Sequence, residues 1–165
     1  MLRLRPYKKC DAQHIVEWLT DEVGFRRWCA DRYDHYPIVA DDMNRMYSAT
    51  EEEDTFFPFT AFDEEGVAGH LIMRFTDEDK TDLRFGFIIV SDKRRGKGYG
   101  RQMLELALSY AYDILKVNRV TLGVFENNPA AYRCYRSVGF EETGERENMS
   151  ILGEEWTCIV MEHRR

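Results

Sequence analysis

The chain has few of the features that mark metal-binding, secreted or membrane-spanning proteins. Its four cysteines, Cys10, Cys29, Cys134 and Cys158, lie far apart and form no CxxC pair, a spacing that suits neither a zinc site nor a disulfide framework. No apolar run approaches the roughly 20 residues that span a bilayer, and the N-terminal stretch MLRLRPYKKC lacks the apolar segment of a signal peptide. We therefore expect no metal site, no membrane partner and a cytoplasmic location.

Positive charge is also in short supply. The chain has 23 Lys and Arg against 30 Asp and Glu, a net charge of −7, which disfavours general binding to nucleic acid or anionic membranes. This balance suits a cationic or amine-bearing partner, although solubility alone explains it more simply. Because 44% of the 165 residues are hydrophobic and no repeat or linker interrupts them, we expect a single domain over residues 1–165 that buries its own core.

The spacing of apolar residues predicts a strand and helices first and further strands afterwards. A short strand at LRLRP is followed by helical segments up to about residue 50. TFFPFTAF and GVAGHLIMRF then flank a turn as an antiparallel hairpin. In the next segment, DLRFGFIIV, strict alternation places four apolar side chains on one face of a strand. These are Leu83, Phe85, Phe87 and Ile89.

The second half of the chain alternates between helices and strands. We expect a helix from Gly100 to Lys116, a strand at RVTLGVF, a short helix at PAAYRCYRSV and two closing strands. The middle strand–helix–strand unit requires a parallel, right-handed crossover. The predicted fold class is therefore α/β, with a mixed, mostly antiparallel sheet and flanking helices.

The stretch SDKRRGKGYGRQM, residues 91–103, combines glycine with positive charge directly before a helix. Such a connection leaves main-chain N–H groups unpaired at the helix N-terminus, where the helix dipole adds partial positive charge. Glycines let the backbone approach an anion closely, so the stretch predicts a phosphate or pyrophosphate site. The alternative is a basic turn in which the glycines serve only tight geometry. The residues concerned are Gly96, Gly98 and Gly100, with Arg94, Arg95, Lys97 and Arg101 around them.

Two motifs favour the phosphate site. The loop matches the pattern Arg/Gln-x-x-Gly-x-Gly/Ala at Arg95, Gly98 and Gly100. A second pattern, Asn-x-x-Ala-x-x-x-Tyr-x-x-x-Gly-Phe, is matched by Asn128, Ala131, Tyr135, Gly139 and Phe140. In this order, and over residues 83–140, the chain resembles the GNAT superfamily of N-acetyltransferases. It is most similar to the bacterial branch that includes ribosomal-protein alanine acetyltransferases.

The resemblance implies an acyl-CoA N-acyltransferase fold with a splayed parallel pair of central strands, and acetyl-CoA as cosubstrate. Main-chain amides from Arg95 to Arg101 would hold the pyrophosphate, and Asn128 would bind the pantetheine arm, cap its own helix, or do both. Tyr135 would protonate the leaving thiolate as a general acid; the alternative is a ring that only packs on the cofactor. The implied cofactor-binding set is Ile88, Ile89, Val90, Arg95, Gly96, Lys97, Gly98, Tyr99, Gly100, Arg101, Asn128, Ala131 and Tyr135.

The sequence departs from better-known relatives at the two positions where they place a Glu general base, which are Arg84 and Gly123 here. Asp82, Glu126 and His70 are the nearest substitutes, and we expect them to be ordinary surface or strand residues. A missing base favours an acceptor amine of low pKa, or a chain of water molecules that ends at a carboxylate elsewhere in the protein. Neutralising a Lys amine near neutral pH costs about 4 kcal/mol, against roughly 1 kcal/mol for an α-amine.

Arg84 is the one candidate contact to the acceptor. By alternation it shares a face with Gly86 and Ile88, and its guanidinium could pair with a carboxylate on the acceptor. A cross-strand salt bridge is the favoured alternative.

These features predict an acetyl-CoA-dependent N-acetyltransferase that acts on a primary amine, of a small molecule or a protein N-terminus, by direct attack. The alternative is a domain that binds acetyl-CoA without turnover, as a sensor or scaffold. The oligomeric state is open, with a homodimer as one option.

Overall fold

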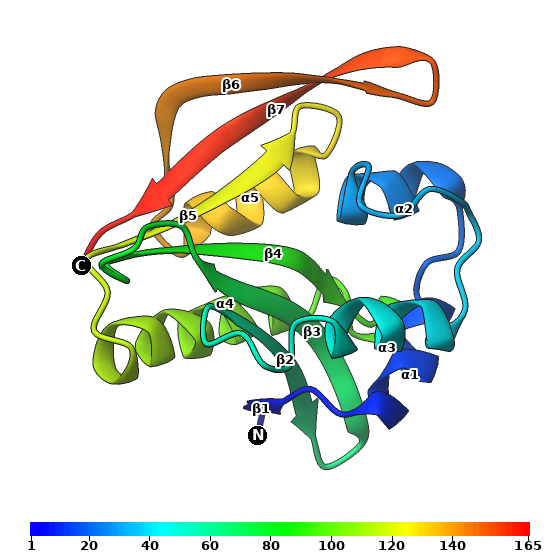
Figure 1. The fold of residues 1–165 in the computed structure, drawn as a ribbon, viewed down its shortest axis with the longest axis horizontal. Coiled ribbons are helices and arrows are strands. Elements are labelled where there is room, and N and C mark those ends of the chain that lie inside the picture. The colour runs from blue at the N-terminus through cyan, green and yellow to red at the C-terminus, as the bar shows by residue number, and fades with distance from the viewer.

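The computed structural model describes residues Met1–Arg165 and contains one seven-stranded sheet (Figure 1). Its strand order is β1-β2-β3-β4-β5-β7-β6, and every neighbouring pair is antiparallel except β4 and β5. This confirms the predicted mixed, mostly antiparallel sheet. The strands are β1 Arg3–Pro6, β2 Phe56–Asp63, β3 Gly66–Phe75, β4 Asp82–Val90, β5 Arg119–Phe125, β6 Glu141–Ile151 and β7 Glu154–His163.

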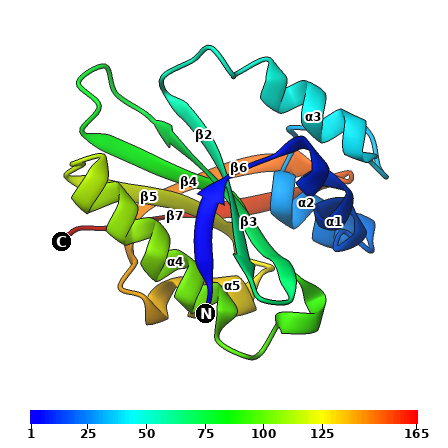
Figure 2. The ribbon, with the colours of Figure 1, turned by 90° about the horizontal axis from the view of Figure 1, so that it is seen from below.

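Helices cover both faces of the sheet (Figure 2). On one face lie α1 Ala12–Glu17, α2 Glu22–Cys29 and α3 Ala40–Ser48, and on the other lie α4 Tyr99–Ser109 and α5 Pro129–Ser137. A π-helical turn, Tyr110–Ile114, extends α4 to within two residues of the predicted end at Lys116, and short 3-10 turns occupy Lys9–Asp11 and Asp92–Arg94. Every helix is too short or too polar to cross a membrane.

Each face of the sheet has its own core. The larger core, of 22 buried residues, lies between the sheet and α4, and the smaller, of 13 residues, lies under α1, α2 and α3. The helices are amphipathic, so each face buries the apolar stripe of the helices that cover it. The sheet is therefore buried on both faces around β3 and β4, which accounts for the nearly continuous apolar sequence of these two strands.

The side chains of β4 do not keep to one face, so this prediction is wrong. Leu83 and Phe85 belong to the core under α4, whereas Phe87 and Ile89 belong to the core under α1–α3. Between them the backbone of Phe87 has a φ of +49°, a region that non-glycine residues seldom adopt.

The cause is a β-bulge. Ile72 of β3 pairs with Gly86, but His70, two residues earlier, pairs with Ile89, so β4 carries one extra residue. An extra residue reverses the alternation beyond it and bends the strand. Ile88 consequently packs on the α4 side, opposite to the face that simple alternation predicts for it.

The parallel strands β4 and β5 separate soon after they meet. Their pairing covers only Asp82–Arg84 against Arg119–Thr121, although both strands continue well beyond these residues, and Figure 1 shows them diverging. The rest of β4, after the bulge, therefore has main-chain groups on its β5 side that are not paired with β5. The splayed strand pair is thus present in the structure.

Candidate active site

A cavity of about 490 Å³ opens where β4 and β5 diverge. It is lined by the end of β4, the glycine loop, the start of α4 and one face of α5. Of the residues predicted to bind the cofactor, Lys97 alone is not among those lining it. The others are Ile88, Ile89, Val90, Arg95, Gly96, Gly98, Tyr99, Gly100, Arg101, Asn128, Ala131 and Tyr135.

The glycine loop presents a run of free main-chain donors. Gly96 and Gly98 have φ values of +74° and +81°, which side chains with a Cβ disfavour. None of the N–H groups from Gly96 to Arg101 donates a hydrogen bond to another residue. Because these groups include the N-terminus of α4, they form a concave cluster of donors that suits a diphosphate. The Lys97 N–H belongs to this run although its side chain points elsewhere.

Gly100 is a glycine for a different reason. Its φ is ordinary, but a Cβ there would lie 3.3 Å from the Sγ of Cys134 on α5. The third glycine of the loop therefore allows α4 and α5 to approach each other, and contributes to the site by placing the two helices that border it.

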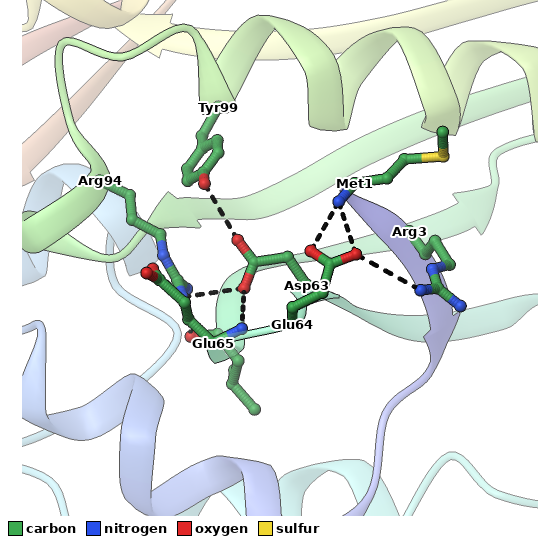
Figure 3. Close-up of polar contacts among 8 residues, drawn as sticks. Met1, Arg3, Asp63, Glu64, Glu65, Arg94 and Tyr99 are labelled. Carbon is green, nitrogen blue, oxygen red and sulfur yellow. Dashed lines mark hydrogen bonds and ion pairs between the residues drawn. The ribbon is translucent and has the colours of Figure 1, made fainter.

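Arg94 does not add free charge to the loop, as the sequence suggested. It is 8% exposed, and its guanidinium donates to an Asp63 carboxylate oxygen at 2.9 Å and to the carbonyl oxygen of Val67 (Figure 3). The hydroxyl of Tyr99 donates to the other oxygen of Asp63 at 3.0 Å. Arg94 and Tyr99 thus fasten both ends of the glycine loop to the β2–β3 turn.

The Asp63 carboxylate is held in its charged form. Desolvation opposes ionisation, but the Glu65 amide, the Tyr99 hydroxyl and the Arg94 charge together lower the pKa of Asp63. Arg95 and Lys97 carry the free positive charge instead, since both are exposed and neither forms an ion pair. Arg101 is exposed as well but pairs with Glu105 along α4, at 2.9 Å.

Tyr135 lies on α5 and lines the cavity. It is 7% exposed, and its hydroxyl is not engaged by another residue. Burial raises the pKa of Tyr135 above its ordinary value, so the phenol keeps its proton at neutral pH. A protonated, unpartnered hydroxyl at this place can donate a proton into the cavity.

Asn128 caps α5. Its side-chain oxygen accepts a hydrogen bond from the Ala131 N–H at 3.4 Å, which is the usual role of Asn at a helix N-terminus. The residue also lines the cavity, so capping leaves its amide NH₂ available to a ligand.

The two positions expected to hold a general base contact each other. A Cβ at Gly123 would lie 2.8 Å from Nη2 of Arg84 and 2.7 Å from Sγ of Cys158. The guanidinium of Arg84 therefore covers the Gly123 position, and the space that a Glu would need there is filled.

None of the substitute bases faces the cavity. Asp82 pairs with Arg119 at 2.9 Å, and Glu126 pairs with Arg146 at 3.0 Å. His70 is fully buried; its Nδ1 bonds the Phe59 carbonyl and its Nε2 bonds the Tyr47 hydroxyl, each at 2.7 Å. All three are structural, as the sequence favoured.

Arg84 forms no salt bridge. Its register partner on β3 is Arg74, a second cation, and neither guanidinium has a carboxylate within 4 Å. The prediction of a cross-strand ion pair for Arg84 is therefore wrong.

Aromatic side chains that the motifs did not indicate close the far side of the cavity. Trp28 of α2 lines it, with its ring centroid 4.9 Å from that of Phe87, and stacks on Tyr33. The Nε1 of Trp28 and the hydroxyl of Tyr33 are buried without a hydrogen-bond partner. The family resemblance points to the region of Trp28 and Tyr33 as the acceptor side, but their contact with Phe87 depends on the fold, because α2 meets β4 only in the folded chain.

Residues 1–141 match the family model described as "Acetyltransferase (GNAT) domain". The chain belongs to this family. The match confirms the family that the two motifs indicated, and it extends from the glycine loop and α5 back to the N-terminal helices.

The fold is shared with a solved structure, spermidine N-acetyltransferase from Vibrio cholerae in complex with CoA and spermine. The two are 23% identical and superpose with a TM-score of 0.84, over 99% of this chain and 95% of that one. This confirms the predicted fold class, and the CoA in that structure agrees with the acetyl-CoA expected here.

Curated relatives carry related names. Spermine/spermidine N(1)-acetyltransferase of Bacillus subtilis is 34% identical over 71 residues, 42% of this chain and 47% of the relative. Spermidine N(1)-acetyltransferase of Escherichia coli K12 is 23% identical over 145 residues, 87% of this chain and 75% of the relative. The chain thus matches less than half the length of the first of these proteins. Neither name supports the ribosomal-protein alanine branch, and that finer placement stays a prediction.

Proposed function

We propose that the protein is an acetyl-CoA-dependent N-acetyltransferase that acetylates a primary amine by direct attack. The observation that carries the proposal is one cavity with two features: unpaired N–H groups from Gly96 to Arg101 at one end, and the buried Tyr135 hydroxyl within it. The first suits the diphosphate of coenzyme A, and the second suits the leaving group of its thioester.

The residues divide the work between binding and chemistry. The amides of the glycine loop hold the diphosphate, and the main chain of Ile88–Val90, unpaired with β5, holds the pantetheine arm as an added strand would. Acetyl-CoA supplies the acetyl group as a thioester. The amine nitrogen forms a bond to the carbonyl carbon, the carbon–sulfur bond breaks, and Tyr135 gives its proton to the sulfur. The proton lost by the amine passes to solvent, and Tyr135 is reprotonated from solvent.

The acceptor is a primary amine on a small molecule or at a protein N-terminus. A small molecule is favoured by the names of the relatives, which act on spermidine or spermine. A protein α-amine is favoured by the missing carboxylate base, since an α-amine loses its proton more readily than a Lys side chain.

Two measurements test the proposal. Release of free thiol from acetyl-CoA in the presence of a panel of amines measures turnover, and the shift in Tm with CoA measures binding. We expect both signals. A Tm shift without thiol release from any amine would support a non-catalytic sensor instead, and the absence of a shift at millimolar CoA would refute the proposed site.

A further inference from the structure

Three arginines gather on the face of the sheet that α1–α3 cover. Arg74 of β3 and Arg84 of β4 are register partners, so their side chains lie on the same face at adjacent positions. Arg32, in the segment after α2, places its guanidinium 5.8 Å from the centre of the Phe87 ring. Phe87 also lines the cavity, so the group borders the candidate active site.

None of the three has an anionic partner, and the side chains of Arg74 and Arg84 make no hydrogen bond either. Elsewhere a buried or half-buried arginine either pairs with a carboxylate, as Arg94 does with Asp63, or donates to main-chain carbonyls, as Arg26 does. With 30 acidic residues against 23 basic ones, carboxylates are not scarce. Placing Arg74 and Arg84 side by side without one is therefore unfavourable for the protein alone, because like charges directly opposite each other destabilise a sheet.

The repulsion between the positive charges is least screened by solvent at Arg74, which is half-buried. Its pKa is lowered by burial first, and then by the positive charges of Arg84 and Arg32; the exposed Glu147 of β6 acts in the opposite direction without forming an ion pair. Glu147 is the one acidic side chain that acts on Arg74, so the charges of Arg84 and Arg32 are opposed there by a single carboxylate that forms no ion pair. An anion bound between Arg74 and Arg84 would remove the repulsion.

Arg84 borders the cavity that contains Tyr135. Nη2 of Arg84 lies 2.8 Å from the point where a Cβ of Gly123 would be, and Gly123 lines the same cavity as Tyr135. A ligand that contacts Arg84 there can therefore place another of its atoms in the cavity.

We propose that the acceptor amine also carries an anionic group, a carboxylate or a phosphate, which Arg74 and Arg84 bind, with the exposed Arg32 adding attraction. This inference rests on the proposed N-acetyltransferase function and names its substrate class. Guanidinium donors match both anions, often through two parallel hydrogen bonds.

The same charges favour the chemistry. Positive charges beside an ammonium lower its pKa, so Arg74 and Arg84 would help the acceptor lose the proton that no carboxylate base is placed to take. They would also repel an acceptor that carries several positive charges and no anionic group. Spermidine, which appears in the names of the relatives, is such an acceptor.

The first test compares acceptors that differ only in the anionic group. Thiol release at saturating acetyl-CoA is measured with lysine against cadaverine, with phosphoethanolamine against ethanolamine, and with spermidine. We expect the anionic member of a pair to have a kcat/KM at least about 100-fold higher. The preferred pair identifies the anion. A preference for spermidine or for the decarboxylated amines would overturn the inference and leave the proposed function intact.

The second test does not depend on finding the acceptor. With CoA saturating, so that the loop site is filled, acetate and inorganic phosphate are titrated into the protein by calorimetry. We expect saturable binding of at least one anion, weakened about tenfold or more in R84Q and in R74Q. The control is R45Q, on α3, because Arg45 is exposed and pairs only with Asp41 and Asp42. Equal binding, or none, in the wild type and both variants would refute the site.

Unfolding separates a binding role from a structural one. Removing one of two repelling charges should leave the Tm of R74Q and R84Q, without ligand, unchanged or higher, since sites built for ligands often reduce stability. A clear fall in Tm together with unchanged acceptor preference would assign the arginines to the structure instead. If the wild type does not bind CoA, the proposed function itself is refuted. That result is distinguishable from each outcome that refutes only the anion site.

Discussion

The two walls of the cavity recognise their ligands by different means. The wall formed by the glycine loop and α4 offers main-chain N–H groups from consecutive residues, Gly96 to Arg101. The opposite wall offers side chains from α2 and β4, among them Trp28 and Phe87, and Arg84 borders it beside Gly123. The first wall is a property of one short segment, whereas the second exists only where distant segments meet.

This difference also separates what a family shares from what distinguishes its members. A main-chain cradle needs a backbone shape and a few glycines, so many sequences can form it. A side-chain wall changes with every substitution. Here, for example, the guanidinium of Arg84 lies against Gly123, and any larger residue at position 123 would displace it.

The largest effect expected on the chemistry is that of Tyr135→Phe. Loss of the proton donor should lower kcat at least about 100-fold, while the Kd for CoA changes less than about twofold because the ring remains. Steady-state thiol release and calorimetry measure the two quantities. An undiminished kcat would return Tyr135 to a packing role on the cofactor wall.

In the core beneath α3, away from the cavity, we expect sensitivity to acid through His70. Burial lowers the pKa of His70 to about 4. As the pH falls, His70 is therefore protonated near pH 6.5 in the unfolded chain but only near pH 4 in the folded chain, so acid favours unfolding. The contribution of neutral His70 to the free energy of unfolding should be fully present above about pH 6.5 and should fall by about 3 kcal/mol as the pH falls to about 4. Urea unfolding across this range should show a smaller fall in His70→Gln. The exposed His14, replaced by Gln, is the control and should keep the wild-type slope.

Among substitutions in the glycine loop, a change at Gly98 should weaken CoA binding strongly. Gly98→Val forces a branched side chain to a φ of +81°, at a cost of about 1–3 kcal/mol, and should raise the Kd for CoA about 30-fold. Gly153→Val is the matched control, because Gly153 has a φ of +75° in the β6–β7 turn with open space around it. Equal weakening of CoA binding by both variants would mean that strain, and not the cradle, is responsible.

The smallest effect is expected at Gly100. An added methyl group would meet Cys134 at 3.3 Å, a contact that a small shift of α5 relieves, so Gly100→Ala should cost under about 1 kcal/mol. CoA affinity should change less than about threefold by calorimetry. A loss as large as that of Gly98→Val would show that the cradle tolerates no side chain at Gly100 beside the bound CoA.

Local patterns predicted the elements well. The strand at RVTLGVF is β5 residue for residue, and α5 begins at Pro129 as expected. Both elements carry their signals within a few residues: an apolar run of strand-forming residues in one, and Asn128 followed by Pro129 in the other. The glycine loop was recognisable for the same reason.

The errors share one physical cause. The bulge at Phe87 occurs where β4 pairs with β3 on one side and separates from β5 on the other. The alternation of residues within β4 carries no information about either neighbouring strand. Arg94 belongs to the basic run in sequence, yet it is bound by Asp63, which lies 31 residues earlier in the chain. Arg84 was expected to meet an acid and instead faces Arg74.

The order of elements and the glycine loop that opens α4 were therefore determined by the sequence alone, because each depends on residues within a turn or two of one another. The side on which each β4 residue emerges, the burial of Arg94 against Asp63, and the placement of Arg84 opposite Arg74 were decided only by the tertiary structure. Electrostatic energy depends on distance in space, and the chain sets that distance only when it folds.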